Sequence, residues 1–338
     1  GDSAGYARYL STRDIFATCG FAKIEKVGSG GGNILGRTLF NWRILLNGKI
    51  NTLWPEPRAS LMAGILYGER GSMPKSLKND FSNSGLSHIV AVSGYNTSVI
   101  ALVMMAVFIF IGCWRRQSFW LSSVSLVLFT LFTGATASVV RAAVMAIFVM
   151  SGSYLGRPAR MLNSLLFAAA LMLLFNPRIL FDVGFQLSFV ATVGVSYVGP
   201  LLNKYFIGNR ELSGVKKLVS ELFFTTLGAL VITLPMTIYY FGKLPILAIL
   251  ANILVVGFIP VVMLLGFLAL LLSFVLFPLG LSVAFAGDLG LRYIILVAEQ
   301  LAVGSVAVSL PFIIVILIYL LIFFWLYRLN IYVKKSES

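Results

Sequence analysis

The sequence predicts an all-α polytopic membrane protein, a bundle of about 8–10 transmembrane or re-entrant helices that follows a small β segment at the N-terminus. Two observations lead to this prediction. Hydrophobic residues make up 59% of the 338 residues, above the roughly half that is usual in soluble proteins, and the mean hydropathy is +0.95. These residues also gather in runs long enough to cross ~30 Å of hydrocarbon.

Residues 1–33 are polar and mixed, and we expect them to form the β segment. The stretch 14–27 is rich in β-favouring residues and stops at a glycine-rich turn, 28–33. One or two strands do not bury a core by themselves. We therefore expect this segment to be the last part of a small β domain that begins before residue 1.

Residues 34–85 are predicted to hold interfacial helices and connectors. Apolar residues recur at helical spacing from Ile34 to Ile50, with Trp42 at the depth of the membrane surface. A helix that packs on the β domain fits the same pattern. The stretch 61–67 is too short to span a bilayer, and a short polar helix is expected over 74–84.

Nine apolar runs from residue 86 onward form the predicted membrane domain, residues 86–330, and a short tail, 331–338, follows. The expected spans are 86–112, 119–135, 137–155, 161–175, 179–202, 219–241, 245–278, 280–303 and 308–329. The run 245–278 is over-long and contains Gly257 and Pro260, so it is either one crossing or two half-helices. One crossing puts Lys334 and Lys335 inside, whereas two half-helices put the tail outside.

The charge of the chain is strongly positive. There are 26 Lys and Arg residues against 12 Asp and Glu, a formal net charge of +14. Basic residues in short loops are typical of the cytoplasmic side of a membrane protein. Placing the basic groups at 115–116, 157–160 and 204–217 inside puts residues 1–85 outside. A basic excess also attracts polyanions such as nucleic acid, and composition alone does not separate the two explanations.

The first long apolar run begins with a polar stretch, residues 84–97. It carries a histidine, several serines, an asparagine and two glycines at the start of a membrane helix. Hydrocarbon does not satisfy such groups, so we expect them to face protein or water. We expect Ser93 and Gly94 to break the helix and to expose backbone groups to a cavity.

Arg141 lies inside another apolar run. A guanidinium stays charged, so at this depth it needs a carboxylate, backbone carbonyls, water or an anionic ligand. One explanation is an ion pair with Asp182 that joins two helices. The other is a phosphate-facing cation in a hydrated passage. Asp182 and Gln186 are four residues apart and are expected to share a helix face.

Asp288 and Arg292 are also four residues apart, inside the expected span 280–303. Together with Glu299, seven residues after Arg292, they give this span an ionisable stripe. The stripe either holds the bundle together or forms the wall of a channel, and we exclude a purely lipid-facing position.

His88 and Ser93 raise the question of a hydrolase, because residues 91–94 resemble the Gly-x-Ser-Gly of intramembrane serine proteases. Five residues on one helix are about 140° apart, which points the two side chains in different directions. No second histidine exists in the sequence to act as the base or to build a multi-histidine metal site. We therefore expect no enzyme activity, no metal and no cofactor.

Three sequence blocks resemble the competence domain of ComEC-type competence proteins. The first is Gly85-Leu-Ser-His-Ile-Val-Ala-Val-Ser-Gly94. Gly134-Ala-Thr-Ala-Ser-Val-Val-Arg-Ala-Ala143 and Asn176-Pro-Arg-Ile-Leu-Phe-Asp-Val-Gly-Phe-Gln-Leu-Ser-Phe189 follow in order. Leu66-Tyr-Gly-Glu-Arg-Gly71 is similar to the segment that precedes the first block in the family. The resemblance covers about residues 58–330.

The resemblance implies a channel in the bacterial inner membrane that passes single-stranded DNA to the cytoplasm during natural transformation. It also implies that residues 5–27 end an extracytoplasmic OB-like domain. The implied partners are single-stranded DNA, membrane lipid, and separate DNA receptor, ATP-driven motor and nuclease proteins. Carried over by position, the motif residues are Ser87, His88, Ser93, Gly94, Arg141, Asp182 and Gln186. Tyr95, Asn96, Asp288 and Arg292 complete the expected channel lining.

The sequence departs from the family pattern in two places. Tyr95 and Asn96 stand where many members have Leu and His, so the polar group there changes but remains. Many members also carry a terminal metallo-hydrolase domain, and the His/Asp cluster of such a metal site is not found in this sequence. We expect nuclease activity to belong to another protein.

Two other functions fit the same residues. A small-solute or lipid transporter would use Arg141 and Asp182 as a site at mid-membrane depth. A membrane scaffold that transports nothing would use the same charges only to hold its helices together.

Overall fold

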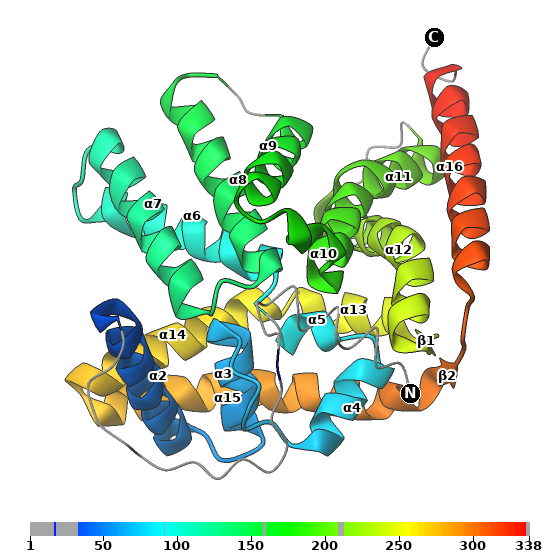
Figure 1. The fold of residues 1–338 in the computed structure, drawn as a ribbon. Coiled ribbons are helices and arrows are strands. Elements are labelled where there is room, and N and C mark those ends of the chain that lie inside the picture. The colour runs from blue at the N-terminus through cyan, green and yellow to red at the C-terminus, as the bar shows by residue number, and fades with distance from the viewer. Residues whose placement is uncertain (1–16, 18–32, 91, 158–159, 209–212, 336–338) are drawn as a thin grey trace.

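In a computed structural model the chain is a set of helices joined by short connections, with one two-stranded sheet (Figure 1). The structure describes residue 17 and residues 33–90, 92–157, 160–208 and 213–335. The predicted β segment at residues 1–33 therefore lies almost wholly outside the described residues. The sheet instead pairs β1 (Lys243–Pro245) antiparallel with β2 (Ser305–Ala307).

The structure confirms the all-α polytopic fold. In chain order, the described helices are α2 (Ile34–Leu53), α3 (Arg58–Tyr67), α4 (Lys75–Asn83), α5 (Ser87–Val90), α6 (Gly94–Phe110), α7 (Arg115–Phe132), α8 (Ala137–Tyr154), α9 (Met161–Phe175), the 3₁₀ turn η1 (Pro177–Phe181), α10 (Val183–Val193), the π turn η2 (Gly194–Val198), α11 (Gly199–Ile207), α12 (Gly214–Phe241), α13 (Ala248–Val256), α14 (Ile259–Val275), α15 (Phe277–Leu301), the 3₁₀ turn η3 (Ala302–Gly304) and α16 (Phe312–Lys335).

Five segments of the described chain are long and apolar enough to cross a membrane. They are Ala137–Tyr154, Val183–Ile207, Lys216–Phe241, Phe277–Gly304 and Phe312–Val333. A sixth results if α13 and α14, which meet at a bend of 44°, are counted as one span. The shorter apolar helices α6 and α9 add to the bundle, as expected for a multi-pass membrane protein with broken spans.

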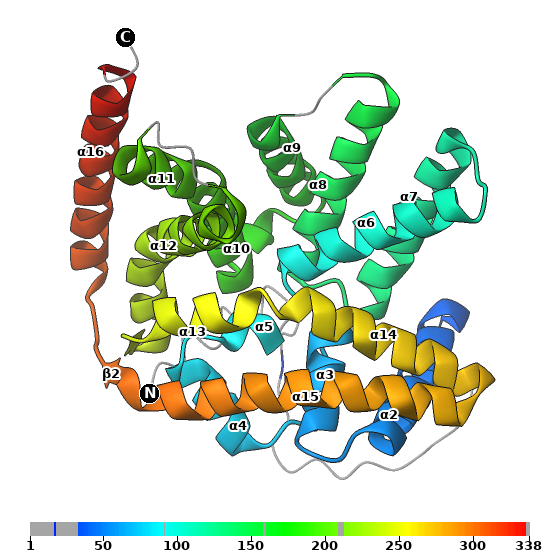
Figure 2. The same cartoon turned by 180° about the vertical axis from the view of Figure 1, so that it is seen from behind.

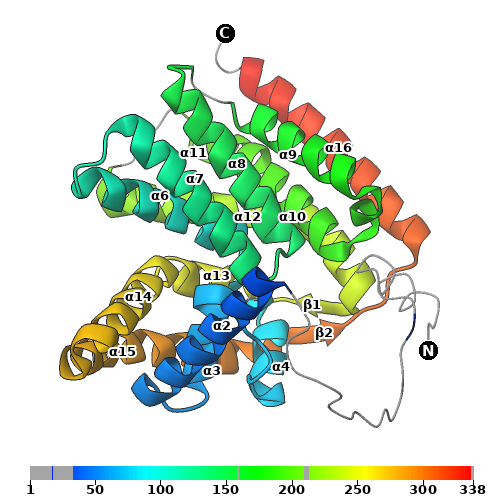
Figure 3. The ribbon, with the colours of Figure 1, turned by 60° about the vertical axis from the view of Figure 1, so that its left-hand side comes forward.

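The helices form two groups, one above the other. In Figure 1, α14 and α15 run side by side across the lower part, with α2, α3 and α4 beside them, while α6–α9 and α10–α12 with α16 lie above. The same arrangement seen from behind, in Figure 2, shows α15 running crosswise to α16. Figure 3 shows α2, α3 and α4 coming together next to α15.

The largest hydrophobic core surrounds α3. Leu61, Met62 and Ile65 of this helix are fully buried, together with apolar residues of α13, α14 and α15. Polar contacts anchor the chain that leads into α3. The indole N–H of Trp54 donates to the carbonyl oxygen of Ala284 on α15 at 3.0 Å. A ten-residue apolar helix too short to span a bilayer is therefore enclosed by protein.

Helix α2 exposes part of its apolar surface, which fits an interfacial helix and equally a helix that packs on a β domain. Ile34 and Trp42 expose their side chains, whereas Ile50 and Leu53 near the end of the helix are buried. Arg43 donates from Nε to the carbonyl oxygen of Phe132, 2.7 Å away at the end of α7. The helix is thus fixed to the bundle at one edge and leaves apolar side chains free for lipid.

Two of the expected spans are divided, and local residues explain both divisions. The run 86–112 forms α5 and α6, because the hydroxyl of Ser93 accepts the N–H of Asn96 and so caps a new helix. The run 245–278 forms two half-helices, α13 and α14, and Pro260 stands in the first turn of the second.

Glycines bring α12 into direct backbone contact with the segment η2–α11. A Cβ atom at Gly228 of α12 would lie 2.7 Å from the Cα atom of Gly199 and 2.8 Å from the carbonyl oxygen of Gly194. No side chain other than hydrogen fits between these two backbones. Small residues of this kind let membrane helices approach closely and gain van der Waals contact.

Candidate functional site

The break between α5 and α6 is held in place by α3. Asn96 is 2% exposed, and its Nδ2 donates to the carbonyl oxygen of Ile65, 3.2 Å away on α3. Its Oδ1 faces the hydroxyl of Ser93 at 3.1 Å. These contacts fix the first turn of α6, so the positive end of its dipole has a defined direction.

Arg141 of α8 lies next to this first turn. Its side chain is buried, 6% exposed, and Nη1 donates to the carbonyl oxygen of Ser188 on α10 at 2.6 Å. The guanidinium also lies over the ring of Phe189, with 5.8 Å between its carbon and the ring centroid. The Nε atom is buried and has no hydrogen-bond partner. Within the described part of the chain, no carboxylate pairs with Arg141.

Gly94 leaves the space that the Arg141 guanidinium occupies. A Cβ atom at position 94 would collide with Nη2 of Arg141, and it would lie 3.6 Å from Cζ. The positive N-terminal end of the α6 dipole and the positively charged guanidinium of Arg141 therefore lie next to each other. Both favour an anion there, which gives this site its chemical character.

Asp182 does not neutralise Arg141. Its carboxylate accepts the backbone N–H of Phe185 at 2.8 Å and caps the N-terminus of α10. Ser188, the residue that Arg141 contacts, is six positions further along, about 9 Å at 1.5 Å per residue. Asp182 and Arg141 therefore do not form the ion pair considered from the sequence, because the Asp182 carboxylate is hydrogen-bonded to the backbone at the start of α10.

Gln186 connects two other parts of the upper group. Its Nε2 donates to the carbonyl oxygen of Leu180 at 2.8 Å, and its Oε1 accepts the hydroxyl of Tyr240 at 2.7 Å. The residue thus links the start of α10 to the end of α12, and none of these contacts involves Arg141.

Asp288 holds the lower group together. Its Oδ2 accepts from Nη1 of Arg58 and from Nε of Arg292, both at 2.8 Å. The Arg58 contact ties α15 to the first residue of α3. Of the two expectations for this stripe, the geometry matches a helix-to-helix tie. Arg58 was not among the residues expected from the sequence.

Ser87 and His88 on α5 are exposed. Arg70, in the turn after α3, directs Nη2 toward the carbonyl oxygen of Ser87 at 3.5 Å. The sequence placed Arg70 in a family-like segment but did not single it out as a site residue. Tyr95 stands in the first turn of α6, and its side chain lies outside the described part of the structure.

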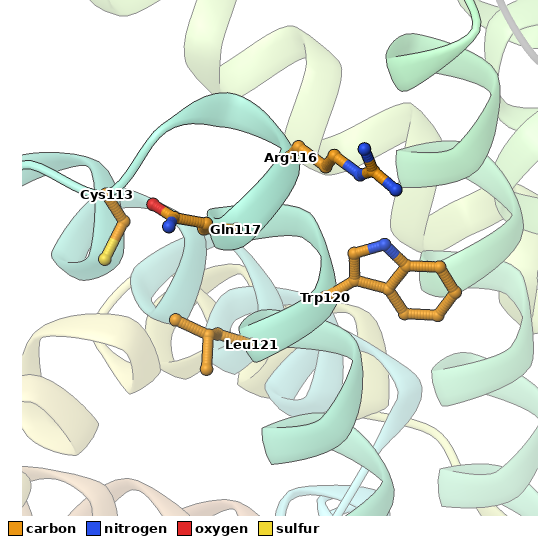
Figure 4. Close-up of a pocket in the computed structure, with 5 residues that line it drawn as sticks. All are labelled: Cys113, Arg116, Gln117, Trp120 and Leu121. Carbon is orange, nitrogen blue, oxygen red and sulfur yellow. The ribbon is translucent and has the colours of Figure 1, made fainter.

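A surface cavity lies elsewhere, at the α6–α7 turn. It has a volume of about 460 Å³ and is lined by Cys113, Arg116, Gln117, Trp120 and Leu121 (Figure 4). None of the residues expected from the sequence lines it. The candidate site is therefore the helix break with Arg141, rather than this open surface cavity.

Two of three comparisons with known proteins, those with protein families and with curated proteins, give a match. Residues 65–331 match the family described as Competence protein. The chain is 28% identical over 208 residues to ComE operon protein 3 of Bacillus subtilis (strain 168), a match that covers 62% of this chain and 26% of that protein. The chain thus spans about a quarter of this curated relative. No solved structure matches it significantly. Since the family match covers most of the sequence, the chain belongs to the competence protein family.

Proposed function

We propose that this chain takes part in DNA uptake for natural transformation, as a channel that passes single-stranded DNA across the bacterial inner membrane. The observation that carries the proposal is Arg141. It is a buried cation with no carboxylate partner in the described chain and with an unused N–H, and it meets the positive end of α6. A backbone phosphate supplies the negative charge and the acceptor that this site lacks.

A single deep cation suits the passage of a polyanion. Each phosphate contact adds salt-dependent affinity, so a dense basic track would hold the strand instead of releasing it. Energy input and degradation of the second strand are not assigned to residues 1–338, because this stretch contains no Gly-x-x-x-x-Gly-Lys-Ser/Thr motif and no metallo-hydrolase cluster.

Deleting the gene and following fluorescently labelled DNA tests this function. The expected result is that labelled DNA still collects at the cell surface but no longer reaches a DNase-resistant state in the cytoplasm, and that a plasmid copy restores import. Normal import in the deletion strain, together with failed uptake of a small solute, would support the transporter alternative instead.

The distribution of basic residues supports an orientation for the bundle. The α6–α7 turn and the end of α8 lie in the upper half of Figure 1, where α16 also ends, and in the sequence Arg115 and Arg157 belong to these two turns. Arg328 lies in the last third of α16. We take the upper side as cytoplasmic and the side of α2–α4 as extracytoplasmic, because basic loops stay inside.

This orientation predicts a cytoplasmic end of α16, which requires that the bent pair α13–α14 crosses the membrane once, as the sixth span. A green fluorescent protein fused after residue 338 is expected to be fluorescent, and alkaline phosphatase fused at the same position is expected to be inactive. Both reporters on one position serve as controls for each other. The reverse pair of results would place the tail outside and contradict the orientation.

A further inference from the structure

A second arginine lies at the other end of the same helix break. Arg70 exposes its side chain in the turn after α3, where Nη2 approaches the carbonyl oxygen of Ser87 at 3.5 Å. No carboxylate in the described residues pairs with it. The adjacent Glu69 uses its Oε1 to accept the N–H of Gly71 at 2.9 Å, inside its own turn.

The turn that carries Arg70 rests on the segment between α5 and α6. A Cβ atom at Gly68 would lie 3.1 Å from Cγ2 of Val92, so the two pieces of chain are in contact. Asn96 closes the contact from the other side through the carbonyl oxygen of Ile65. These contacts connect Arg70 and Ser87, at one end of the helix break, with Gly94 and Arg141 at the other end.

Arg70 is exposed next to α5, close to the carbonyl oxygen of Ser87. Nearby protein lowers the pKa of the Arg70 guanidinium by desolvation, although the side chain remains exposed. Ser87, whose carbonyl oxygen Arg70 approaches, and the adjacent His88, whose imidazole is hydrogen-bonded to the backbone of Gly85, are exposed on α5 and carry a hydroxyl group and an imidazole. Guanidinium, hydroxyl and imidazole N–H groups are all donors to phosphate oxygens, and the guanidinium has five N–H bonds in a fixed fork.

We propose that Arg70, Ser87 and His88 form an entrance site for a backbone phosphate of single-stranded DNA, on the side of the bundle opposite the basic loops. The site rests on the channel function proposed above and adds its outer binding step. The strand contacts Arg70 first and Arg141 further inside. Because these contacts are to phosphate, the site does not distinguish among base sequences.

The test is a binding titration at several salt concentrations. The protein is placed in nanodiscs of neutral phosphatidylcholine, and fluorescence anisotropy follows the binding of a labelled oligo(dT) of about 30 nucleotides. For a single strand, each phosphate contact contributes about 0.7 to the slope of log affinity against log salt. Arg70→Ala is expected to lower the magnitude of that slope by about 0.7, and Arg70→Lys is expected to keep it. Arg37→Ala, at an exposed arginine of α2, is the matched control and should leave the slope unchanged.

Import kinetics give a second measurement. Arg70→Ala is expected to raise the DNA concentration for half-maximal import several-fold while leaving the maximal rate unchanged. A fall in the maximal rate with an unchanged half-maximal concentration would overturn the entrance role.

The binding outcomes separate this site from the channel function. If the wild type binds oligo(dT) and Arg70→Ala leaves the slope of log affinity against log salt unchanged, the entrance site is overturned and the channel proposal stands. An effect of Arg70→Ala that appears only in anionic phosphatidylglycerol nanodiscs would assign Arg70 to a lipid headgroup and would also overturn it. No oligo(dT) binding by the wild type, together with normal import in the deletion strain, would overturn both proposals.

Discussion

Arg141→Ala is expected to reduce DNA import by about 10- to 100-fold while leaving the amount of protein in the membrane unchanged. A hydrogen bond to a charged group contributes about 1.5–3 kcal/mol, and every 1.4 kcal/mol corresponds to about a tenfold change. If a phosphate passes through the site at the break, the loss of this donor raises the barrier by that amount. Import of labelled DNA per molecule of protein, quantified on immunoblots, measures the effect.

Folding is expected to tolerate this change. The carbonyl oxygen of Ser188, which loses the guanidinium, still accepts the hydroxyl of Thr192 at 2.8 Å. Removing a buried cation also removes its desolvation cost. Arg141→Lys keeps the charge but not the planar fork of donors, so import is expected to recover only in part.

Arg43 provides a matched control for the loss of an arginine. It too donates to a backbone carbonyl oxygen, that of Phe132, and it too lies over an aromatic ring, at 5.5 Å. Arg43→Ala is expected to keep import per molecule within about twofold of wild type, which corresponds to roughly 0.4 kcal/mol or less. Equal losses in both variants, or a fall in protein level that matches the fall in import, would show that Arg141 acts as a structural tie.

Gly228→Ala is expected to destabilise the protein strongly. The added methyl group would meet the backbone of Gly199 and the carbonyl oxygen of Gly194, and neither atom belongs to a side chain that could turn away. Overpacking costs about 1–3 kcal/mol or more, against a typical total stability of about 5–15 kcal/mol. The expected result is a lower unfolding temperature in detergent and a several-fold lower level in the membrane.

Gly36→Ala is the control for this prediction. A Cβ atom at Gly36 of α2 meets nothing within 4 Å, and alanine favours a helix over glycine by about 1 kcal/mol. The control is expected to be neutral or slightly stabilising. If Gly228→Ala unfolds at the wild-type temperature, the backbones of η2–α11 and α12 are less tightly apposed than these distances indicate.

Features set by neighbouring residues were predictable from the sequence. Ser93 followed by Gly94 predicted the break that separates α5 from α6, because a serine cap ends one helix and starts the next. Gly257 and Pro260 indicated, for a similar local reason, that the run 245–278 could be divided, one of the two alternatives drawn from the sequence. The i,i+4 spacing of Asp288 and Arg292 predicted their contact.

Features that depend on distant partners were not predictable in this way. The spacing of Asp182 did not reveal that its carboxylate would cap α10 and leave Arg141 unpaired. Arg58 meets Asp288 across 230 residues of sequence, and no periodic pattern connects them. The exposure of Arg70 beside Ser87 likewise depends on how α3 and α5 pack, which composition and spacing do not specify.

The contacts that join the first helices to α15 can form only after α15 has been synthesised. Trp54 and Arg58 both find their partners 230 residues later, on α15. At roughly 5–20 residues per second, a ribosome needs about 10–50 s to make that intervening chain. During this interval the apolar helix α3 has no α14 or α15 to cover it. The nascent segment from α2 to α4 must therefore be sheltered by lipid or by a chaperone until translation has passed the end of α15 at Leu301.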